Sequence, residues 1–269
     1  MSLDRPLAEY LPAEEIVKIL GHPLDEKGFH REWLEKITAR HILSHSSGFP
    51  HGETGKPVPL AFEPGTKWKY SANGYFYLQR VVEHLKGDTL DKLMQKEVLD
   101  PLGMTRSCMV WKPAYETAMA SGHGLLGRPE AFRRRTEAHA GATLYTTAGD
   151  YARFAQMLLN GGELEGVRIL GRKTVELMTT SHTREDLYPP MTGPGFGFGI
   201  GVGVYKGGGL PRLRSVGTFG WDGAAGTFFF DDPKEDLLLI CFTQVFGHRG
   251  MPGNTYQEEF ERLVYQALV

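Results

Sequence analysis

The tyrosine at position 70 is the first residue of this sequence whose type and setting suggest chemistry. It lies in the stretch WKYSANGY, after a proline–glycine turn and before an apolar run, so we expect its hydroxyl at the start of a helix. A phenol has a reference pKa of about 10 and becomes a useful general base only beside a cation that stabilises the phenolate. The alternative is a packing residue with a hydrogen-bonded hydroxyl.

Most motifs that carry a nucleophile or a metal ion are missing from the sequence. It contains no G-x-S-x-G elbow, no H-E-x-x-H and no C-x-x-C. The stretch GETGKP resembles a phosphate loop only superficially, because proline replaces the Ser or Thr that would hold magnesium. His123 and His139 do not have the spacing of metal ligands. We therefore expect no metal ion and no cofactor.

Composition and charge exclude several classes of protein. The 269 residues are 41% apolar and 23% charged, which is ordinary globular usage, and the length suits one large domain. A formal net charge of -2 without a long basic run predicts no nucleic-acid partner and no anionic membrane surface. No apolar stretch approaches the roughly 20 residues of a bilayer span, and the first residues have no signal-peptide pattern. As the chain stands, we expect a cytoplasmic protein with Cys108 and Cys241 unpaired.

Apolar residues at helical spacing predict a mostly helical region over about residues 10–190. The predicted helices are at 12–20, 33–47, 75–86, 90–98, 147–158 and 169–182. Gly87 should end the third of them, and Thr147 should cap the fifth. The third helix should bury one apolar face, made of Tyr75, Leu78, Val81, Val82 and Leu85.

The last third of the chain predicts strands. Glycines alternate with bulky apolar residues over 195–204, which indicates a strand whose bare face another element or a ligand approaches closely. Two apolar runs around DDPKED predict a hairpin within 217–245, in the same antiparallel sheet. A helix over 255–268 should pack on this sheet. It should be capped by Asn254 or Thr255 and bury Phe260, Leu263, Val264 and Leu268. These elements predict an α+β fold.

Four stretches together resemble a known family. They are ITARHILSHSSGFP, FEPGTKWKYSANGYFYLQRVVEHLKGDTLDKLMQKEVLDPLGMTRS, GATLYTTAGDYARFAQMLLNGG and FGWDGAAGTFFFDDPKEDLLLICFTQ. In this order they resemble the serine β-lactamase and penicillin-binding-protein-like family, in its class C and carboxylesterase branch. The resemblance implies one β-lactamase/transpeptidase-like domain over residues 1–269, with the sheet and C-terminal helix at about 195–269. It also implies a serine hydrolase that performs acyl transfer on a small-molecule ester, amide or β-lactam.

The resemblance assigns roles to individual residues. In that family a serine in an S-x-x-K motif is acylated, its lysine and a tyrosine share the proton transfer, and a third motif on an edge strand shapes the oxyanion hole. Tyr70 matches the tyrosine, and the third motif corresponds to Trp221, Asp222 and Gly223. The backbone N–H of Ala224 would then face the developing oxyanion. The alternative is a tight bend with a packed indole.

Other polar residues near these motifs have simpler interpretations. The family triplet is Tyr-x-Asn, but here asparagine comes one place later, so Asn73 is a candidate substrate ligand for which we favour the alternative of a helix cap. His45 is expected to be a hydrogen-bonding residue at a helix end, and Asp150 a first-turn acidic residue. Because Ala72 and Trp221 depart from the lactamase pattern, we expect esters or small acyl compounds rather than β-lactams.

The nucleophile itself is missing. No serine in the sequence is followed three positions later by lysine. The resemblance places that motif some tens of residues before LDRPLAEYLP, with which this sequence begins. We therefore expect a chain with weak or no activity, whose uncovered apolar faces are covered by a separate N-terminal segment, by a rearranged core or by a second copy. The alternative is a catalytically dead binding or assembly module that retains the cleft.

Overall fold

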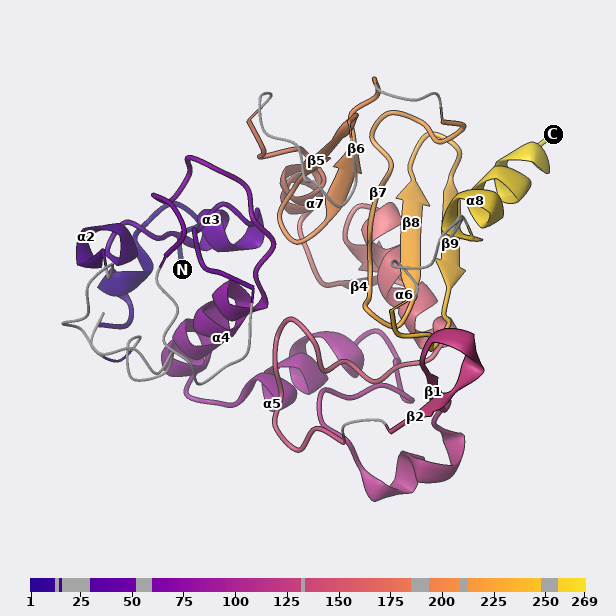
Figure 1. Cartoon of the computed structure of the whole chain (residues 1–269), viewed down its shortest axis with the longest axis horizontal. Helices are drawn as coiled ribbons and strands as arrows, with labels where there is room; N and C mark the ends of the chain where they lie inside the picture. Colours follow the sequence, from indigo (N-terminus) through magenta and orange to yellow (C-terminus); the bar gives the residue numbers. More distant parts are fainter. Residues whose placement is uncertain are drawn as a thin grey trace.

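The computed structural model has the predicted α+β architecture (Figure 1). It describes residues 1–12, 15, 30–51, 60–131, 134–184, 194–208, 212–247 and 256–269. The predicted helix at 12–20 falls almost entirely outside these residues, as do the GETGKP loop and the predicted cap at Asn254 or Thr255. Among the helices that the structure describes, none is both long and apolar enough to cross a lipid bilayer.

Short helices make up most of the first two thirds of the chain. The α-helices are α2 (Arg31–Leu34), α3 (Ala39–Leu43), α4 (Ala72–Lys86), α5 (Leu90–Met94), α6 (Ala148–Leu159) and α7 (Arg172–Met178). Turns of 3₁₀ helix occur at Leu7–Glu9, Pro113–Ala118 and Leu125–Gly127, and a π-helical turn at Gln95–Leu99 continues α5. Two short ladders pair β1 (Gly122–His123) with β2 (Pro129–Glu130) and β3 (Glu163–Leu164) with β4 (Val167–Arg168).

The helix predicted over 33–47 is interrupted, so that prediction is wrong in its extent. Helix α2 ends at Leu34, and α3 begins only at Ala39. Thr38 causes the restart, because its hydroxyl accepts a hydrogen bond from the His41 N–H while the His41 side chain accepts one from the Thr38 N–H. This reciprocal cap fixes a new helix N-terminus.

Helix α4 has both ends near where the sequence predicts them. Gly87 adopts a left-handed φ of 70° and ends the helix, as glycine can without a steric cost. The predicted buried face is only partly right. Leu78 and Val81 are buried, but Leu85 is 45% exposed, and Tyr77 fills the core in its place. The buried face is therefore rotated toward Tyr77 relative to the predicted one.

The last third of the chain forms one antiparallel five-stranded sheet with strand order β5-β6-β7-β8-β9. Its strands are β5 (Phe196–Phe198), β6 (Gly203–Tyr205), β7 (Phe219–Asp222), β8 (Phe228–Asp232) and β9 (Leu237–Cys241). The predicted hairpin is β8 and β9, with Phe230 opposite Leu239. Alternate β8 side chains face opposite sides of the sheet, so Phe229 joins the core beside α6 while Phe228 contacts the C-terminal helix α8.

The glycine-rich run over 195–204 is a hairpin rather than the single strand that its period predicts. Gly199 N–H bonds to the Val202 carbonyl at 2.8 Å, and Gly201 has a φ of 84° that reverses the chain between β5 and β6. The close approach predicted for its bare face is confirmed. A Cβ on Gly199 would lie 2.1 Å from the Met178 carbonyl oxygen at the end of α7.

The C-terminal helix α8 (Tyr256–Gln266) packs on the sheet as predicted, but with a different face. Phe260 contacts Phe228 with ring centroids 5.8 Å apart. Leu263 is 58% exposed, and Leu268 is exposed as well, whereas Glu261 is buried. Glu261 takes the inward position because both of its carboxylate oxygens accept hydrogen bonds from the buried guanidinium of Arg214.

Replacing Glu261 by glutamine should lower the free energy of unfolding by about 3–5 kcal/mol, because the Arg214 charge would stay buried without its counter-ion. Urea denaturation followed by circular dichroism measures this. The matched control is Glu259→Gln, which removes an exposed partner of Arg262 on the same helix and should cost less than about 1 kcal/mol. Equal losses in both variants would contradict the prediction.

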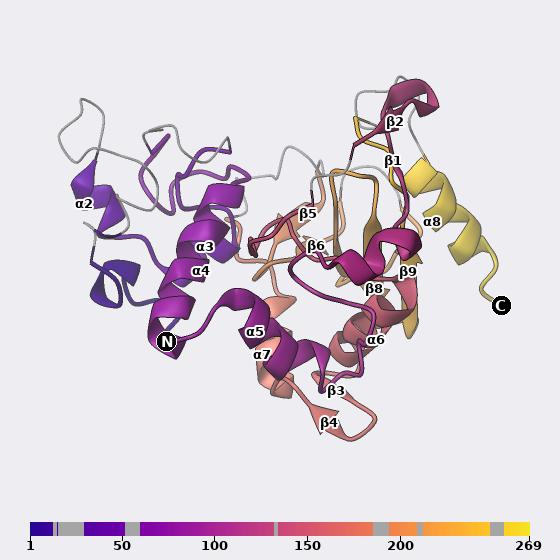
Figure 2. The same ribbon diagram turned by 90° about the horizontal axis from the view of Figure 1, so that it is seen from below.

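Two apolar cores hold the molecule together. One lies between α3 and α4 and includes Leu7, Ile42 and Val81. We call α2 to α4 and the loops packed on this core the N-terminal lobe. The other core lies between α6, α7 and the five-stranded sheet and includes Met157 and Phe229, and these elements form the second lobe. Figure 2 shows the two lobes from below, with α5 between them.

Candidate functional site

Tyr70 lies at the border between the two lobes. It directly precedes Ser71, which caps α4 by accepting a hydrogen bond from the Gly74 N–H at 3.1 Å. Ser71 also donates its hydroxyl hydrogen to the Pro50 carbonyl at 3.0 Å, so the cap is tied to a loop of the same lobe. Tyr70 itself is only partly buried. The sequence therefore places this phenol at a fixed helix start rather than within a core.

Tyr70 and Trp221 are neighbours although 151 positions separate them in the sequence (221 minus 70). Their rings are nearly parallel, at 17°, with centroids 6.0 Å apart. Trp221 lies on β7, where its ring also meets the edge of Phe198 at 4.7 Å. The α4 start and the end of β7 thus face each other across the lobe border.

A cluster of rings surrounds this contact, and we call it the aromatic cluster. Its members are His45, Trp68, Tyr70, Tyr75, Phe198 and Trp221. His45 is in the middle, with centroid distances of 4.5 Å to Tyr70 and 4.8 Å to Phe198. Burial, reinforced by the nearby His51, lowers the pKa of His45 to about 3. The central imidazole is therefore neutral at physiological pH.

The hydrogen bonds of His45 agree with the prediction of a histidine beyond a helix end. Its Nδ1 accepts a hydrogen bond from the Ser71 N–H at 3.2 Å, and α3 ends two residues before it. The neighbouring Leu43 carbonyl joins the lobes, because it accepts hydrogen bonds from the Gly201 N–H and from the Tyr75 hydroxyl.

The two tyrosines of WKYSANGY have different environments. The Tyr75 hydroxyl donates to the Leu43 carbonyl at 3.2 Å, and burial, followed by the neighbouring Tyr70, raises the pKa of Tyr75. A phenol held in this way stays protonated and serves packing. The Tyr70 ring instead lies against Trp221 at the lobe border. Tyr70 is therefore the better placed of the two for contact with a ligand.

The predicted oxyanion segment follows Trp221 in a tight turn. Gly223 N–H bonds to the Thr227 carbonyl at 2.7 Å, and Gly226 N–H bonds to the Gly223 carbonyl at 3.0 Å. A Cβ on Gly223 would lie 2.3 Å from the Thr227 hydroxyl oxygen, so the turn has no room for a side chain there. Ala224 is exposed, and among the described residues no hydrogen bond of this turn uses its N–H.

The expectation of an edge strand is wrong for β7 as a whole, because β7 is the third of the five strands. It holds for the end of the strand. On the β6 side the register pairs Gly203 with Gly220 and ends there, whereas Trp221 and Asp222 pair only with β8 within the described residues. The chain turns between β5 and β6 before it reaches this level, which leaves one side of Trp221 open to the aromatic cluster.

Asn73 does not cap α4, which corrects the interpretation that we favoured from the sequence. Ser71 provides the cap, because the backbone becomes helical at Ala72 and the Ser71 oxygen is three residues from Gly74. Asn73 is buried in the first helical turn. Asp150 is a first-turn acidic residue, as expected, and its carboxylate accepts hydrogen bonds from the Arg106 N–H and the Ser107 hydroxyl.

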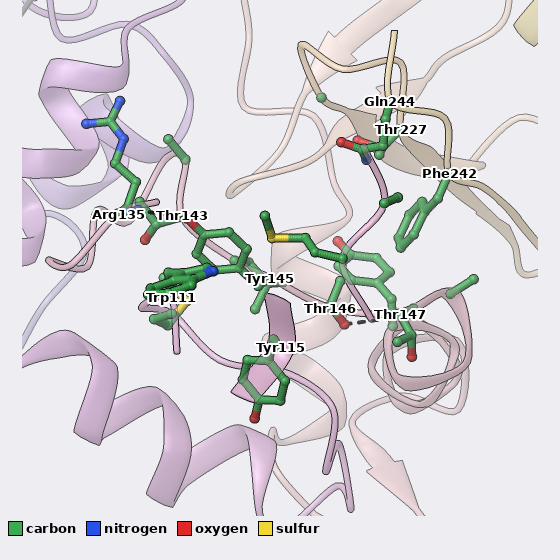
Figure 3. Close-up of a pocket in the computed structure, with 18 of the residues that line it drawn as sticks. Trp111, Tyr115, Arg135, Thr143, Tyr145, Thr146, Thr147, Thr227, Phe242 and Gln244 are labelled. Carbon is green, nitrogen blue, oxygen red and sulfur yellow. Dashed lines mark hydrogen bonds between the residues drawn. The ribbon is translucent and has the colours of Figure 1, made fainter. Parts of the chain in front are cut away.

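A cavity of about 1030 Å³ adjoins the end of β7. Trp221, Asp222 and Gly223 line it, whereas Tyr70, Asn73 and Ala224 do not. Figure 3 shows side chains from the 111–147 segment on one side and from the ends of β8 and β9 on the other. Those it labels are Trp111, Tyr115, Arg135, Thr143, Tyr145, Thr146, Thr147, Thr227, Phe242 and Gln244. The wall is thus aromatic with hydroxyl and amide groups between the rings.

Sequence analysis missed the 111–147 wall of this cavity. The segment has only short elements, and its aromatic residues lack a helical or strand period that would place them on a common face. The sequence predicts Thr147 only as the cap of α6, a role confirmed by its hydrogen bond from the Asp150 N–H at 3.1 Å. Pairing of Cys108 with Tyr145 through two backbone hydrogen bonds folds the segment back along the cavity.

Ser71 is the serine next to Tyr70 in the sequence, but it is not arranged as a nucleophile. It is buried, its oxygen accepts from Gly74, and its hydrogen is donated to Pro50. A serine becomes nucleophilic only when an adjacent base removes its proton. The geometry of Ser71 is that of a helix cap.

The fold and these motifs define a member of the β-lactamase family. The family model described as Beta-lactamase matches residues 1–261, so the chain belongs to that family. Protein Rv1367c of Mycobacterium tuberculosis is 29% identical over 245 residues, which cover 78% of this chain and 60% of that protein. Lovastatin esterase of Penicillium rubens is 30% identical over 296 residues, covering 89% of this chain and 72% of the esterase.

A solved structure has the same fold. EstCE1, a hydrolase with promiscuous acyltransferase activity, superposes with a TM-score of 0.78 at 20% identity and covers 98% of this chain and 78% of EstCE1. The chain spans about 60% of the length of the Mycobacterium tuberculosis protein. The predicted membership of the serine β-lactamase and penicillin-binding-protein-like family and the predicted fold class are confirmed.

Proposed function

We propose that this chain provides the proton-transfer and oxyanion parts of an acyl-transfer site, and that the acylated serine comes from outside these 269 residues. In this proposal Tyr70 is the general base. The backbone N–H of Ala224 stabilises the developing oxyanion, Gly223 keeps the turn open, and Trp221 and Asp222 contact the substrate. Such a site would hydrolyse or transfer the acyl group of a small-molecule ester.

The observation that carries the proposal is the contact between Tyr70 and Trp221 at the lobe border. A base and an oxyanion donor must face the same acyl group, and Trp221, on which Tyr70 stacks and which directly precedes the oxyanion turn, lines the cavity. A phenol needs a cation to act as a base, and the family's S-x-x-K lysine would supply it together with the serine.

The size of the cavity suits a small-molecule substrate. Ligand pockets usually have volumes of about 300–1000 Å³, and this cavity of about 1030 Å³ is at the upper end of that range. An ester is favoured over a β-lactam because Trp221 and Ala72 depart from the lactamase pattern, and because one relative is named as an esterase.

The second candidate is a binding or assembly module that uses the same cavity without catalysis. The absence of any S-x-x-K motif from the sequence favours it. The two candidates differ in one observable property: only the enzyme acquires a reactive serine when the missing segment is present.

A fluorophosphonate probe should label no serine stoichiometrically in the 269-residue chain. A chain extended upstream through the preceding reading frame should be labelled at a serine before Met1, because there the lysine and serine join Tyr70. Intact-mass spectrometry followed by peptide mapping measures both. The unextended chain should accelerate hydrolysis over the uncatalysed reaction in water by at most on the order of 10³-fold.

Two outcomes would contradict this proposal in different ways. Full labelling of Ser46, Ser71 or another serine within residues 1–269 would show that the chain has its own nucleophile. An extended chain that folds but is not labelled would support the binding module instead.

A further inference from the structure

We propose that His45 is the positioning residue for Tyr70, holding the phenol in register with Trp221 through two hydrogen bonds that bracket it and one ring contact. That Tyr70 acts as a base rests on the proposed function above, whereas its placement by His45 rests on the geometry alone.

The two hydrogen bonds reach the residues on either side of Tyr70. The His45 carbonyl accepts from the Lys69 N–H at 2.9 Å, and His45 Nδ1 accepts from the Ser71 N–H at 3.2 Å. Fixing the N–H groups at positions 69 and 71 fixes the backbone from which the Tyr70 side chain extends. The imidazole ring then lies 4.5 Å from the phenol ring, centroid to centroid.

The conformation of His45 is itself unusual and is held from several sides. Its φ is 57°, in the left-handed region that non-glycine residues seldom adopt, and its side chain is buried. Trp68, Tyr75 and Phe198 contact the ring on its other sides. A strained residue enclosed in this way is kept because the surrounding structure determines it, as happens most often at functional sites.

The protonation state of the imidazole suits this role. Since Nδ1 accepts the Ser71 hydrogen, it carries no proton, and the neutral ring has its hydrogen on Nε2. Burial keeps the ring neutral through the physiological range. The acceptor for Ser71 is therefore present whenever the protein is folded near neutral pH.

Two substitutions separate the role of the acceptor from that of the backbone. In His45→Asn, the amide oxygen is bonded to Cγ as Nδ1 is, and asparagine tolerates a left-handed φ. In His45→Gly, the backbone remains free to adopt the same φ, but the acceptor and the ring are both lost. The pair is thus matched for backbone conformation and differs in the hydrogen bond to Ser71.

The first measurement uses the 269-residue chain and needs no activity. Fluorine NMR of the protein labelled with 3-fluorotyrosine gives a Tyr70 signal, identified by its loss in Tyr70→Phe. Stacking on Trp221 should shift this signal away from that of the free amino acid. We expect His45→Asn to keep most of the shift and His45→Gly to lose it, while urea denaturation shows that both variants fold.

The second measurement uses the extended, labelled chain. His45→Gly should slow fluorophosphonate labelling by about 10²-fold, the loss expected when a reacting group moves by about 1 Å, and His45→Asn should stay within about tenfold of the parent. In a Tyr70→Phe background the further effect of His45→Gly should fall below about threefold, because His45 acts through Tyr70.

Each result decides one question. An unchanged Tyr70 signal in a folded His45→Gly variant would overturn the positioning role, whatever the fate of the proposed function. Equal slowing by His45→Gly with and without the Tyr70 hydroxyl would also overturn it. If the extended chain is not labelled at all, the proposed function fails, and the fluorine signal still tests the placement of Tyr70.

Discussion

Replacing Tyr70 by phenylalanine should slow acylation of the extended chain by about 10²- to 10⁴-fold, the usual contribution of a positioned general base. The substitution removes one oxygen atom and keeps the ring that stacks on Trp221 at 6.0 Å. Binding of an ester should change little, so the loss should appear in kcat rather than in KM. Stopped-flow measurement of probe labelling and steady-state hydrolysis of a chromogenic ester provide the two numbers.

The matched control is Tyr75→Phe, five positions further along the same stretch. It removes a hydroxyl that donates to the Leu43 carbonyl and leaves Tyr70 in place. We expect it to change the acylation rate by less than about fivefold and to lower stability by roughly 1 kcal/mol. If Tyr70→Phe lowers the rate no more than this control, Tyr70 is not the base.

Replacing Asp231 by asparagine should raise the free energy of unfolding by roughly 5 kcal/mol at pH 8 and above and change it little near pH 4. Asp231 is buried on β8 between Phe219 and Leu238 of the adjacent strands. Neither carboxyl oxygen has a hydrogen-bond partner among the described residues. Burial therefore raises the pKa of Asp231 to about 8.

The sign follows from proton binding. In the unfolded chain the carboxyl ionises near its ordinary pKa of 3.8, whereas in the folded protein it keeps its proton up to about pH 8. Between these values the folded state binds more protons, so stability falls by about 1.4 kcal/mol for each pH unit of rise. Asparagine cannot ionise, and this slope should disappear. Urea denaturation at several pH values between 4 and 9 measures it.

The neighbouring Asp232 provides a control of opposite sign. Burial opposes its ionisation, but hydrogen bonds from the Tyr265 hydroxyl and from the N–H groups of Ser215 and Lys234 lower its pKa on balance. Asp232→Asn should therefore lose stability at neutral pH, and the loss should vanish as the pH falls below the ordinary carboxyl range.

The prediction for Asp231 would be contradicted by parallel profiles of unfolding free energy against pH for the parent and Asp231→Asn. Such profiles would show that the Asp231 carboxyl is solvated or paired.

Local sequence signals determined much of the secondary structure. Thr147 and Gly87 mark helix ends because a hydroxyl acceptor and a left-handed glycine satisfy backbone groups next to them in the chain. The β8–β9 hairpin follows from two apolar runs around a turn. The resemblance of four ordered stretches, spread along the chain, also predicted the family and the fold class. The helix ends and the hairpin depend on residues within a few positions of one another.

Only the tertiary structure decided which residues meet. The inward position of Glu261 depends on Arg214, 47 positions away, and no helical period contains that information. The element that packs against Gly199 is the end of α7 at Met178, and the 111–147 wall of the cavity faces strands that come later in the chain. His45 became central because Ser71, Tyr70 and Trp221 converge on it. Burial and long-range pairing are properties of the assembled core, so a single sequence names the candidate residues and the fold selects among them.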